Sequence, residues 1–182
     1  VKRVYARERG QSFPETDGMI TDVPGICLVT SYADCVPLYF VDPVKKVIGL
    51  SHSGWRGTVG KIGKVTVEKM EEEFGCDPAD ILGAVGPSIC QDCYEVSEDV
   101  IKKFCENYDE NLWPEIFYQK ENGKYQLNLW KANESVFLES GILPEHIAVT
   151  NVCTHCNPDI LFSHRTTGNE RGTLSAFLAL KK

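Results

Sequence analysis

Two short stretches of the sequence place reactive side chains at the ends of apolar runs. "SYADCVPLYF" contains Asp34 and Cys35, and "IGLSHSGWRG" ends an apolar run on His52. If the two runs pair as an antiparallel hairpin about a turn at 42–45, Cys35 lies opposite His52. Such a pair suits a zinc site, or a nucleophile with its base. A buried structural cysteine beside an unrelated histidine fits the spacing equally well.

The residues after His52 predict an anion site. In "SHSGWRGT" a strand gives way to a glycine turn and then to the start of a helix. Backbone N–H groups from Gly57 onward, together with the guanidinium of Arg56, would then face a phosphate or a carboxylate. The alternative is a glycine turn chosen for its geometry alone, with Arg56 in a surface ion pair.

A second basic loop follows near the C-terminus. "LFSHRTTGNERGT" (161–173) combines His164, Arg165 and Arg171 with two glycines at the end of an expected strand. These side chains could close over a phosphate or a sugar. An exposed basic loop without a ligand is the alternative.

Two cysteine pairs of the Cys-x-x-Cys type occur in the chain, "CQDC" (90–93) and "CTHC" (153–156). Together they would supply the ligands of a four-cysteine zinc site. However, 59 residues lie between the two pairs, far more than in a compact zinc ribbon. Neither pair is in the strand-to-helix turn of a thioredoxin-like motif. We therefore predict that the two pairs do not form one zinc site.

The elements that must position these residues mix strands and helices without regular alternation. Continuous apolar runs predict strands covered on both faces, and Gly75 and Gly141 are expected to end helices. Strands are expected at 25–31, 36–42, 46–52, 80–86, 147–153, 159–164 and 172–180, and helices at 57–75, 97–108 and 127–141. This order predicts an α+β fold, a layered mixed α/β sandwich in a single domain over 1–182.

Composition narrows the class of protein. The 182 residues are 42% hydrophobic and 25% charged, which is typical of a globular chain, and the net charge of -7 disfavours a nucleic-acid surface. No apolar run reaches the roughly 20 residues of a membrane span. The eight cysteines, in a chain of this size, favour a reduced protein of the cytoplasm. We expect a monomer. "VKRVYA" already reads as a strand at Val1, so we also expect an upstream segment.

Several motifs, in this order, make the sequence resemble the YfiH/YlmD family, also described as a multicopper polyphenol oxidase or laccase-domain family. They are "ADC", "HSGWRGT", "GPSICQDCYEV", "CT" and "FSHR", and the resemblance covers essentially the whole chain. It implies a YfiH-like sandwich and zinc-dependent phosphorolysis of adenosine, inosine, guanosine and methylthioadenosine. Adenosine deamination and copper-dependent oxidation of phenols are also attributed to the family.

The resemblance also implies a set of metal ligands. The family holds zinc with two histidines and one cysteine, and Cys35 and His52 match two of these positions. The third is a histidine upstream of the strand that begins this chain, and no histidine precedes His52 here. We expect the 182-residue chain to be poorly metallated and nearly inactive, unless His155 or His164 replaces the missing ligand. His155 and Ser53 are themselves atypical of the family.

Roles for the other residues follow from the same resemblance. Zinc lowers the pKa of bound water to about 7, which would provide hydroxide for attack at C6 of adenine. Asp34 would orient a ligand or carry the proton. Arg56 would bind the phosphate that attacks C1′ of the ribose, with His164 and Arg165 closing from the other side. The expected partners are purine nucleosides and phosphate.

Two other functions remain open. A copper-dependent polyphenol oxidase is disfavoured because the chain has only four histidines, too few for a multicopper centre. A cell-wall or division-associated protein without catalysis is the second alternative.

Overall fold

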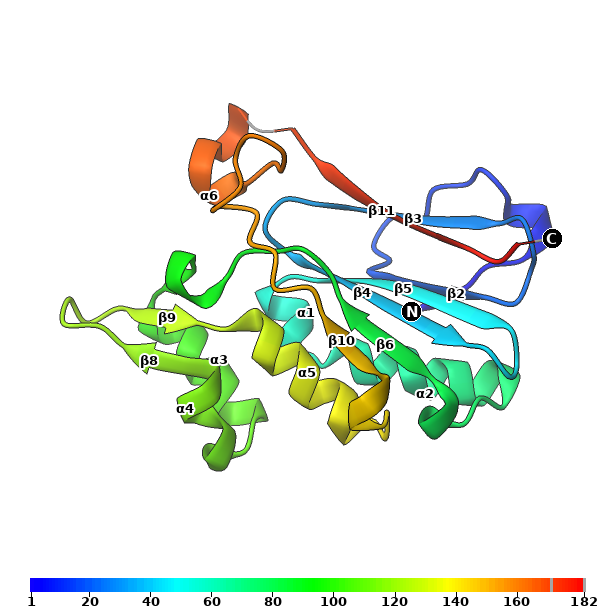
Figure 1. Cartoon of the computed structure of the whole chain (residues 1–182), viewed down its shortest axis with the longest axis horizontal. Helices are drawn as coiled ribbons and strands as arrows, with labels where there is room; N and C mark the ends of the chain where they lie inside the picture. Colours follow the sequence, from blue (N-terminus) through cyan, green and yellow to red (C-terminus); the bar gives the residue numbers. More distant parts are fainter. Residues whose placement is uncertain (171, 182) are drawn as a thin grey trace.

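The computed structural model describes residues 1–170 and 172–181, and a six-stranded sheet lies at its centre (Figure 1). The central strands pair antiparallel, whereas β1 with β2 and β6 with β10 pair parallel at the two edges. Across the sheet the strands are β1 Lys2–Arg3, β2 Gly18–Thr21, β5 Val47–Ser53, β4 Val36–Asp42, β6 Leu82–Val85 and β10 Ile147–Val149.

Helices cover one face of this sheet, and the main core lies between them and the strands. Helix α2 packs on β2 and β5, and α5 packs on β6 and β10. The helices are α1 Trp55–Val59, α2 Ile62–Phe74, α3 Glu98–Asn107, α4 Trp113–Ile116, α5 Leu129–Glu139 and α6 His164–Thr167. Short 3₁₀ helices occupy Ala6–Glu8, Pro78–Asp80, Gln91–Cys93, Glu110–Leu112, Pro144–His146 and Gly168–Glu170. Within the described residues, no helix is long and apolar enough to cross a membrane.

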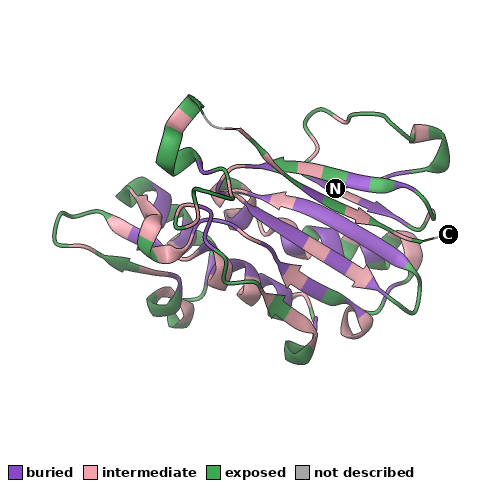
Figure 2. Cartoon of the chain, turned by 45° about the horizontal axis from the view of Figure 1, so that its top comes forward, coloured by how far each residue is buried: buried purple, intermediate pink, exposed green. Residues whose placement is uncertain are grey.

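A pair of strands covers the opposite face. β3 (Cys27–Tyr32) and β11 (Leu174–Ala179) form an antiparallel ribbon over β5, and a second, smaller core fills the gap. Figure 2 shows the buried central strands beneath this ribbon, whose outer positions are exposed. A separate sheet of β7 (Glu95–Val96), β9 (Tyr125–Leu127) and β8 (Phe117–Gln119) lies beside the helices. The predicted layered α+β sandwich is confirmed.

Three predicted elements differ from the structure. Strand β3 alternates exposed and buried residues, so it is covered on one face only, whereas β4 is buried throughout most of its length, as predicted. The predicted helix 57–75 is two helices, because Lys61 adopts a left-handed conformation with φ 51° between them. No strand forms at 159–164, where a turn leads into α6 and the Ser163 hydroxyl accepts a hydrogen bond from the backbone of Thr166.

Candidate functional site

The hairpin of β4 and β5 positions Cys35 and His52. The hairpin forms as predicted, but it turns about residues 43–46 rather than 42–45, so that Pro37 pairs with His52 and Val36 pairs with Ser53. The predicted register, which placed Cys35 directly opposite His52, is therefore wrong by two residues. The reason is a longer turn than the sequence suggested. Cys35, one residue before Val36, lies across from Gly54 rather than His52.

Gly54 nevertheless brings the two side chains together. A Cβ atom built on Gly54 would lie 3.1 Å from the Cys35 sulfur and 3.7 Å from Cε1 of His52. The thiol and the imidazole therefore flank the same point in space, which a larger residue at position 54 would occupy. The absence of a side chain at Gly54 creates the room that a shared ion or a substrate atom would need.

Neighbouring residues fix the orientation of His52. Its Nδ1 lies 3.4 Å from Oδ1 of Asp17, and its backbone N–H donates to the carbonyl of Asp17 at 2.6 Å. The ring of Tyr32 lies against the imidazole, with the centroids 5.4 Å apart. Burial raises the pKa of the Tyr32 phenol well above its usual range. A carboxylate on one ring nitrogen is the usual way to orient a histidine whose other nitrogen binds a metal or a substrate.

Asp34 is buried and acts as a clamp. Its Oδ1 accepts a hydrogen bond from the Thr154 hydroxyl at 2.6 Å, and its Oδ2 accepts one from the backbone N–H of Arg165 at 2.7 Å. Both carboxylate oxygens are therefore occupied by donors from the C-terminal part of the chain. The geometry favours a positioning role for Asp34 over proton transfer.

Arg165 is the residue that this clamp holds. Its Nη1 and Nη2 atoms both donate to the carbonyl of Glu95 at 3.0 Å, and the guanidinium lies over the ring of Tyr94 at 5.3 Å. A guanidinium has five N–H groups, so three remain for a ligand. His164, the first residue of α6, is exposed beside it. Arg171 lies outside the described residues.

Tyr94 is a member of this cluster that sequence reasoning missed. Burial raises the pKa of its phenol to about 12, the negative charges of Cys35 and Asp34 add to the rise, and Arg165 and Arg56 oppose it. The phenol therefore lies within the electrostatic reach of all four groups. The only signal in the sequence was its position directly after Cys93, the second cysteine of the first Cys-x-x-Cys pair, in "DCYEV".

Arg56 remains a candidate for anion binding, but the N-terminus of helix α1 is not a candidate anion site. Its guanidinium lies over the Trp55 ring at 4.3 Å, and no described carboxylate is within ion-pair distance of it. Helix α1 has only five residues, too few for the predicted anion site at a helix N-terminus. Gly57 has a geometric role, because a Cβ there would lie 3.3 Å from the carbonyl of His52.

Within the described residues, neither His155 nor His164 forms a three-ligand group with Cys35 and His52. Nδ1 of His155 instead lies 2.9 Å from the hydroxyl of Thr166.

The prediction that the two Cys-x-x-Cys pairs do not form one zinc site rested on their separation in sequence, and the structure contradicts that argument. The sulfur atoms of Cys90, Cys93, Cys153 and Cys156 all lie within 4.8 Å of one another. A parallel bridge between Ser88 and Cys153 brings the two loops together despite their separation in sequence. Burial raises the pKa of Cys153, but hydrogen bonds from the backbone of Cys90 and Cys156 outweigh it and lower the pKa.

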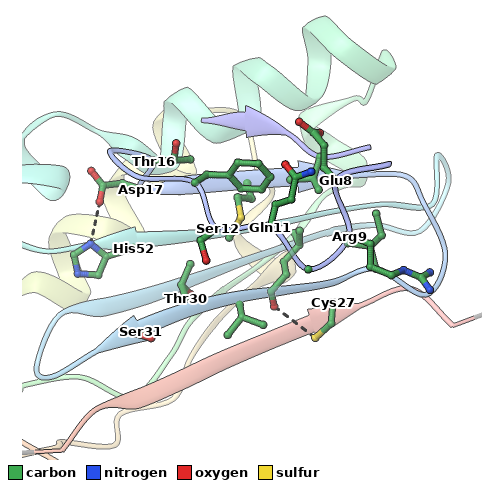
Figure 3. Close-up of a pocket in the computed structure, with 17 residues that line it drawn as sticks. Glu8, Arg9, Gln11, Ser12, Thr16, Asp17, Cys27, Thr30, Ser31 and His52 are labelled. Atoms are coloured by element: carbon green, nitrogen blue, oxygen red, sulfur yellow. Dashed lines mark hydrogen bonds and ion pairs between the residues drawn. The ribbon is translucent and has the colours of Figure 1, made fainter. Parts of the chain in front are cut away.

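A cavity of about 590 Å³ lies beside His52, between the loop of residues 8–17 and β3 (Figure 3). His52 is the one predicted site residue that lines it. Glu8, Arg9, Gln11 and Thr30 also line this cavity. His52 thus lines this cavity and also lies beside Gly54, where the Cys35 sulfur approaches.

Comparisons with known proteins agree with this geometry. Residues 1–181 match the family model described as multi-copper polyphenol oxidoreductase laccase. The chain is 34% identical to the purine nucleoside phosphorylase YlmD of Bacillus subtilis, covering 100% of this chain and 67% of that protein. It is 35% identical to the adenosine deaminase RL5 of an unknown prokaryotic organism, covering 91% of this chain and 62% of that protein.

Solved structures give the same result. The chain superimposes on Bacillus licheniformis YfiH with a TM-score of 0.94 at 33% identity, over 98% of this chain and 69% of that one. Its TM-score with Geobacillus stearothermophilus YlmD is also 0.94, at 34% identity, over 100% of this chain and 69% of that one. The chain spans about two thirds of the length of its bacterial relatives. The motifs, the sandwich and the matches together show that the chain belongs to the multi-copper polyphenol oxidoreductase laccase family, which includes YfiH and YlmD.

Proposed function

We propose that the protein is a purine nucleoside phosphorylase. In this reaction a phosphate oxygen bonds to C1′ of the ribose, the bond from C1′ to the purine breaks, and the base leaves with a proton. The observation that carries the proposal is the Asp34–Arg165 clamp. It fixes the backbone of Arg165, whose guanidinium has spare donors and lies in the cluster containing Tyr94. Relatives named purine nucleoside phosphorylase support the same reaction.

Arg165 and Arg56 would bind the phosphate. Both lower the pKa of Tyr94 against the rise that burial causes, so both contribute positive charge to the same region. The planar fork of an arginine can bind two phosphate oxygens at once, which aligns the nucleophile and reduces its mobility. Asp34 would keep Arg165 in place. The ring of Tyr94 would pack against the Arg165 guanidinium, and its phenol would remain neutral at physiological pH. His164, exposed next to Arg165, would close the site from the solvent side.

Cys35 and His52 are donors of the type that zinc prefers, and Gly54 leaves room between them. Catalytic zinc sites usually have three protein ligands, and the described residues supply two here. Zinc held at this position would polarise a substrate oxygen or activate water. The expectation that a further histidine completes the site remains a prediction.

Two neighbouring activities are secondary candidates. Adenosine deamination is favoured by the relative that carries that name. Copper-dependent oxidation of phenols is suggested by the family description, but the chain has only four histidines, too few for a multicopper centre. The eight cysteines, in a chain of this size, support a reducing compartment such as the cytoplasm.

The test is an assay of the protein, as its gene encodes it, with inosine in the presence and absence of phosphate. The proposal expects hypoxanthine and ribose 1-phosphate in equal amounts, with no base released when phosphate is omitted. Ammonia released from adenosine without phosphate would favour deamination. Phenol oxidation that requires copper would favour the oxidase, and no turnover of any of these substrates would favour a protein without catalysis.

A further inference from the structure

The four-cysteine cluster is separate from the site proposed for catalysis. Its members are Cys90, Cys93, Cys153 and Cys156, and each sulfur lies within 4.8 Å of the other three. Four sulfurs around one zinc ion, at bonds of about 2.3 Å, are about 3.8 Å apart in a tetrahedron. We propose that these four thiolates bind one structural zinc ion.

The backbone around the cluster is arranged as a thiolate site requires. The N–H groups of Cys90 and Cys156 donate to the sulfur of Cys153 at 3.3 and 3.4 Å. Four thiolates carry more negative charge than one zinc ion cancels, so N–H donors to sulfur stabilise the complex. The Cys90–Cys93 segment also folds as a tight turn, with the N–H of Cys93 donating to the carbonyl of Cys90 at 3.2 Å. That turn directs both of its sulfurs to one side.

A pair of disulfides is the competing interpretation. The sulfurs of Cys93 and Cys156 are 3.5 Å apart, whereas a disulfide bond is about 2.05 Å long. Two disulfides would need close contacts within each pair, but not the approach of all four sulfurs to one another. The mutual approach of all four favours a single shared ion.

The position of the cluster indicates what the ion does. Cys93 precedes Tyr94, and Cys153 precedes Thr154, which donates to Asp34. Residues 150–163 form no regular strand or helix, and Ile160 and Phe162 within them are exposed. Few apolar contacts therefore order this segment. A four-coordinate zinc site leaves no open position for substrate, so the ion would act by joining the two loops that support the Arg165 cluster.

Metal content separates this site from the one at Cys35 and His52. The protein, purified under reducing conditions, should retain about one zinc ion per chain in a Cys35→Ala, His52→Ala double variant. A Cys93→Ser, Cys156→Ser double variant in the same background should lose that ion. The matched control is Cys27→Ser with Cys105→Ser, which removes one exposed and one half-buried thiol outside the cluster and should retain it.

Cobalt substitution of the Cys35→Ala, His52→Ala variant tests the ligands even if the serine variants fold poorly. Co²⁺ should give the intense absorption bands of a tetrahedral thiolate site. A chelator strong enough to remove the metal should lower the unfolding temperature by roughly 5 °C or more. The proposal is overturned if the reduced protein binds no zinc in this background, or if the cluster variant and the control hold equal zinc. A disulfide between Cys93 and Cys156 in the reduced protein would also overturn it. These readouts do not depend on turnover, so they stand apart from the proposed phosphorolysis.

Discussion

Oδ2 of Asp34 accepts a hydrogen bond of 2.7 Å from the backbone N–H of Arg165, a residue 131 positions later in the chain. Asp34 precedes Cys35 at the start of the hairpin, in a left-handed conformation with φ 76°. The bond therefore joins the start of the hairpin, which carries the thiol, to helix α6, which carries the guanidinium. If the site works as proposed, weakening this bond should affect both stability and turnover.

Replacing the carboxylate of Asp34 by an amide tests the clamp. Asp34→Asn keeps the shape and tolerates the left-handed backbone, but the amide has only one oxygen. One of the two donors then meets an uncharged acceptor, and the other meets an NH₂ group that cannot accept. We expect the free energy of unfolding to fall by about 1–2 kcal/mol and phosphorolysis to fall with it. Urea denaturation and the inosine assay measure the two effects. Asp159→Asn, at an exposed position, should change neither. Equal stability of the two variants would show that the clamp contributes nothing.

Arg165→Lys tests recognition of phosphate. Lysine keeps the charge but lacks the planar fork, so it cannot donate to Glu95 and to two phosphate oxygens together. We expect KM for phosphate to rise about tenfold, equivalent to about 1.4 kcal/mol, while KM for inosine changes little. Arg7→Lys is the matched control, because Arg7 also lies over a tyrosine ring, at 4.8 Å from Tyr5. If both KM values rise in parallel, Arg165 does not bind phosphate.

Gly54→Ala should weaken metal binding at Cys35 and His52 without unfolding the protein. The backbone of Gly54, at φ -72° and ψ 176°, suits alanine, so the added methyl acts only through its contacts with the thiol and the imidazole. We expect turnover and zinc affinity at this pair to fall by more than about tenfold. The control is Gly60→Ala, whose methyl would meet the carbonyl of Arg56 at 3.3 Å and neither donor. A normal zinc affinity in Gly54→Ala would place the ion elsewhere.

Alkaline pH should destabilise the protein in part through Tyr94. Burial raises the pKa of its phenol from 10.0 to about 12, so the folded protein keeps the proton where the unfolded chain releases it. The stabilisation is complete below pH 10 and is lost as the pH rises from 10 towards 12. Tyr94→Phe keeps the ring under Arg165 and should make this decline shallower. Urea denaturation across that range checks it. Tyr118→Phe, with Tyr118 48% exposed, should leave the decline unchanged.

The sequence was sufficient to predict the hairpin that carries Cys35 and His52. Two apolar runs separated by a turn leave one sensible pairing, and β4 and β5 formed within a residue of their expected bounds. The register was not predictable, because it depends on how many residues the turn uses. The break at Lys61 was missed for a similar reason. A left-handed residue between two helices depends on how α2 packs against α5, where Gly63 contacts Phe137.

The rest of the candidate site depends on contacts between distant parts of the chain. Tyr94 and Thr154 stand in the motifs "GPSICQDCYEV" and "CT", but their spacing in sequence does not predict the contacts that they make with Arg165 and Asp34. The two cysteine pairs meet through the bridge between Ser88 and Cys153. The 59 residues between the two pairs led us to predict against a shared ion. The parallel bridge between the two loops brings the pairs together in space despite that distance in sequence.

The most direct test of the central claim is the phosphate-dependent release of hypoxanthine from inosine by the protein and by its Cys35→Ala variant. We predict that the variant loses more than about 100-fold in kcat/KM, because the thiolate beside His52 belongs to the reacting site. Its thermal unfolding and its cobalt spectrum at the four-cysteine cluster should match those of the parent. Phosphorolysis by Cys35→Ala at the rate of the parent protein would contradict the assignment of the active site.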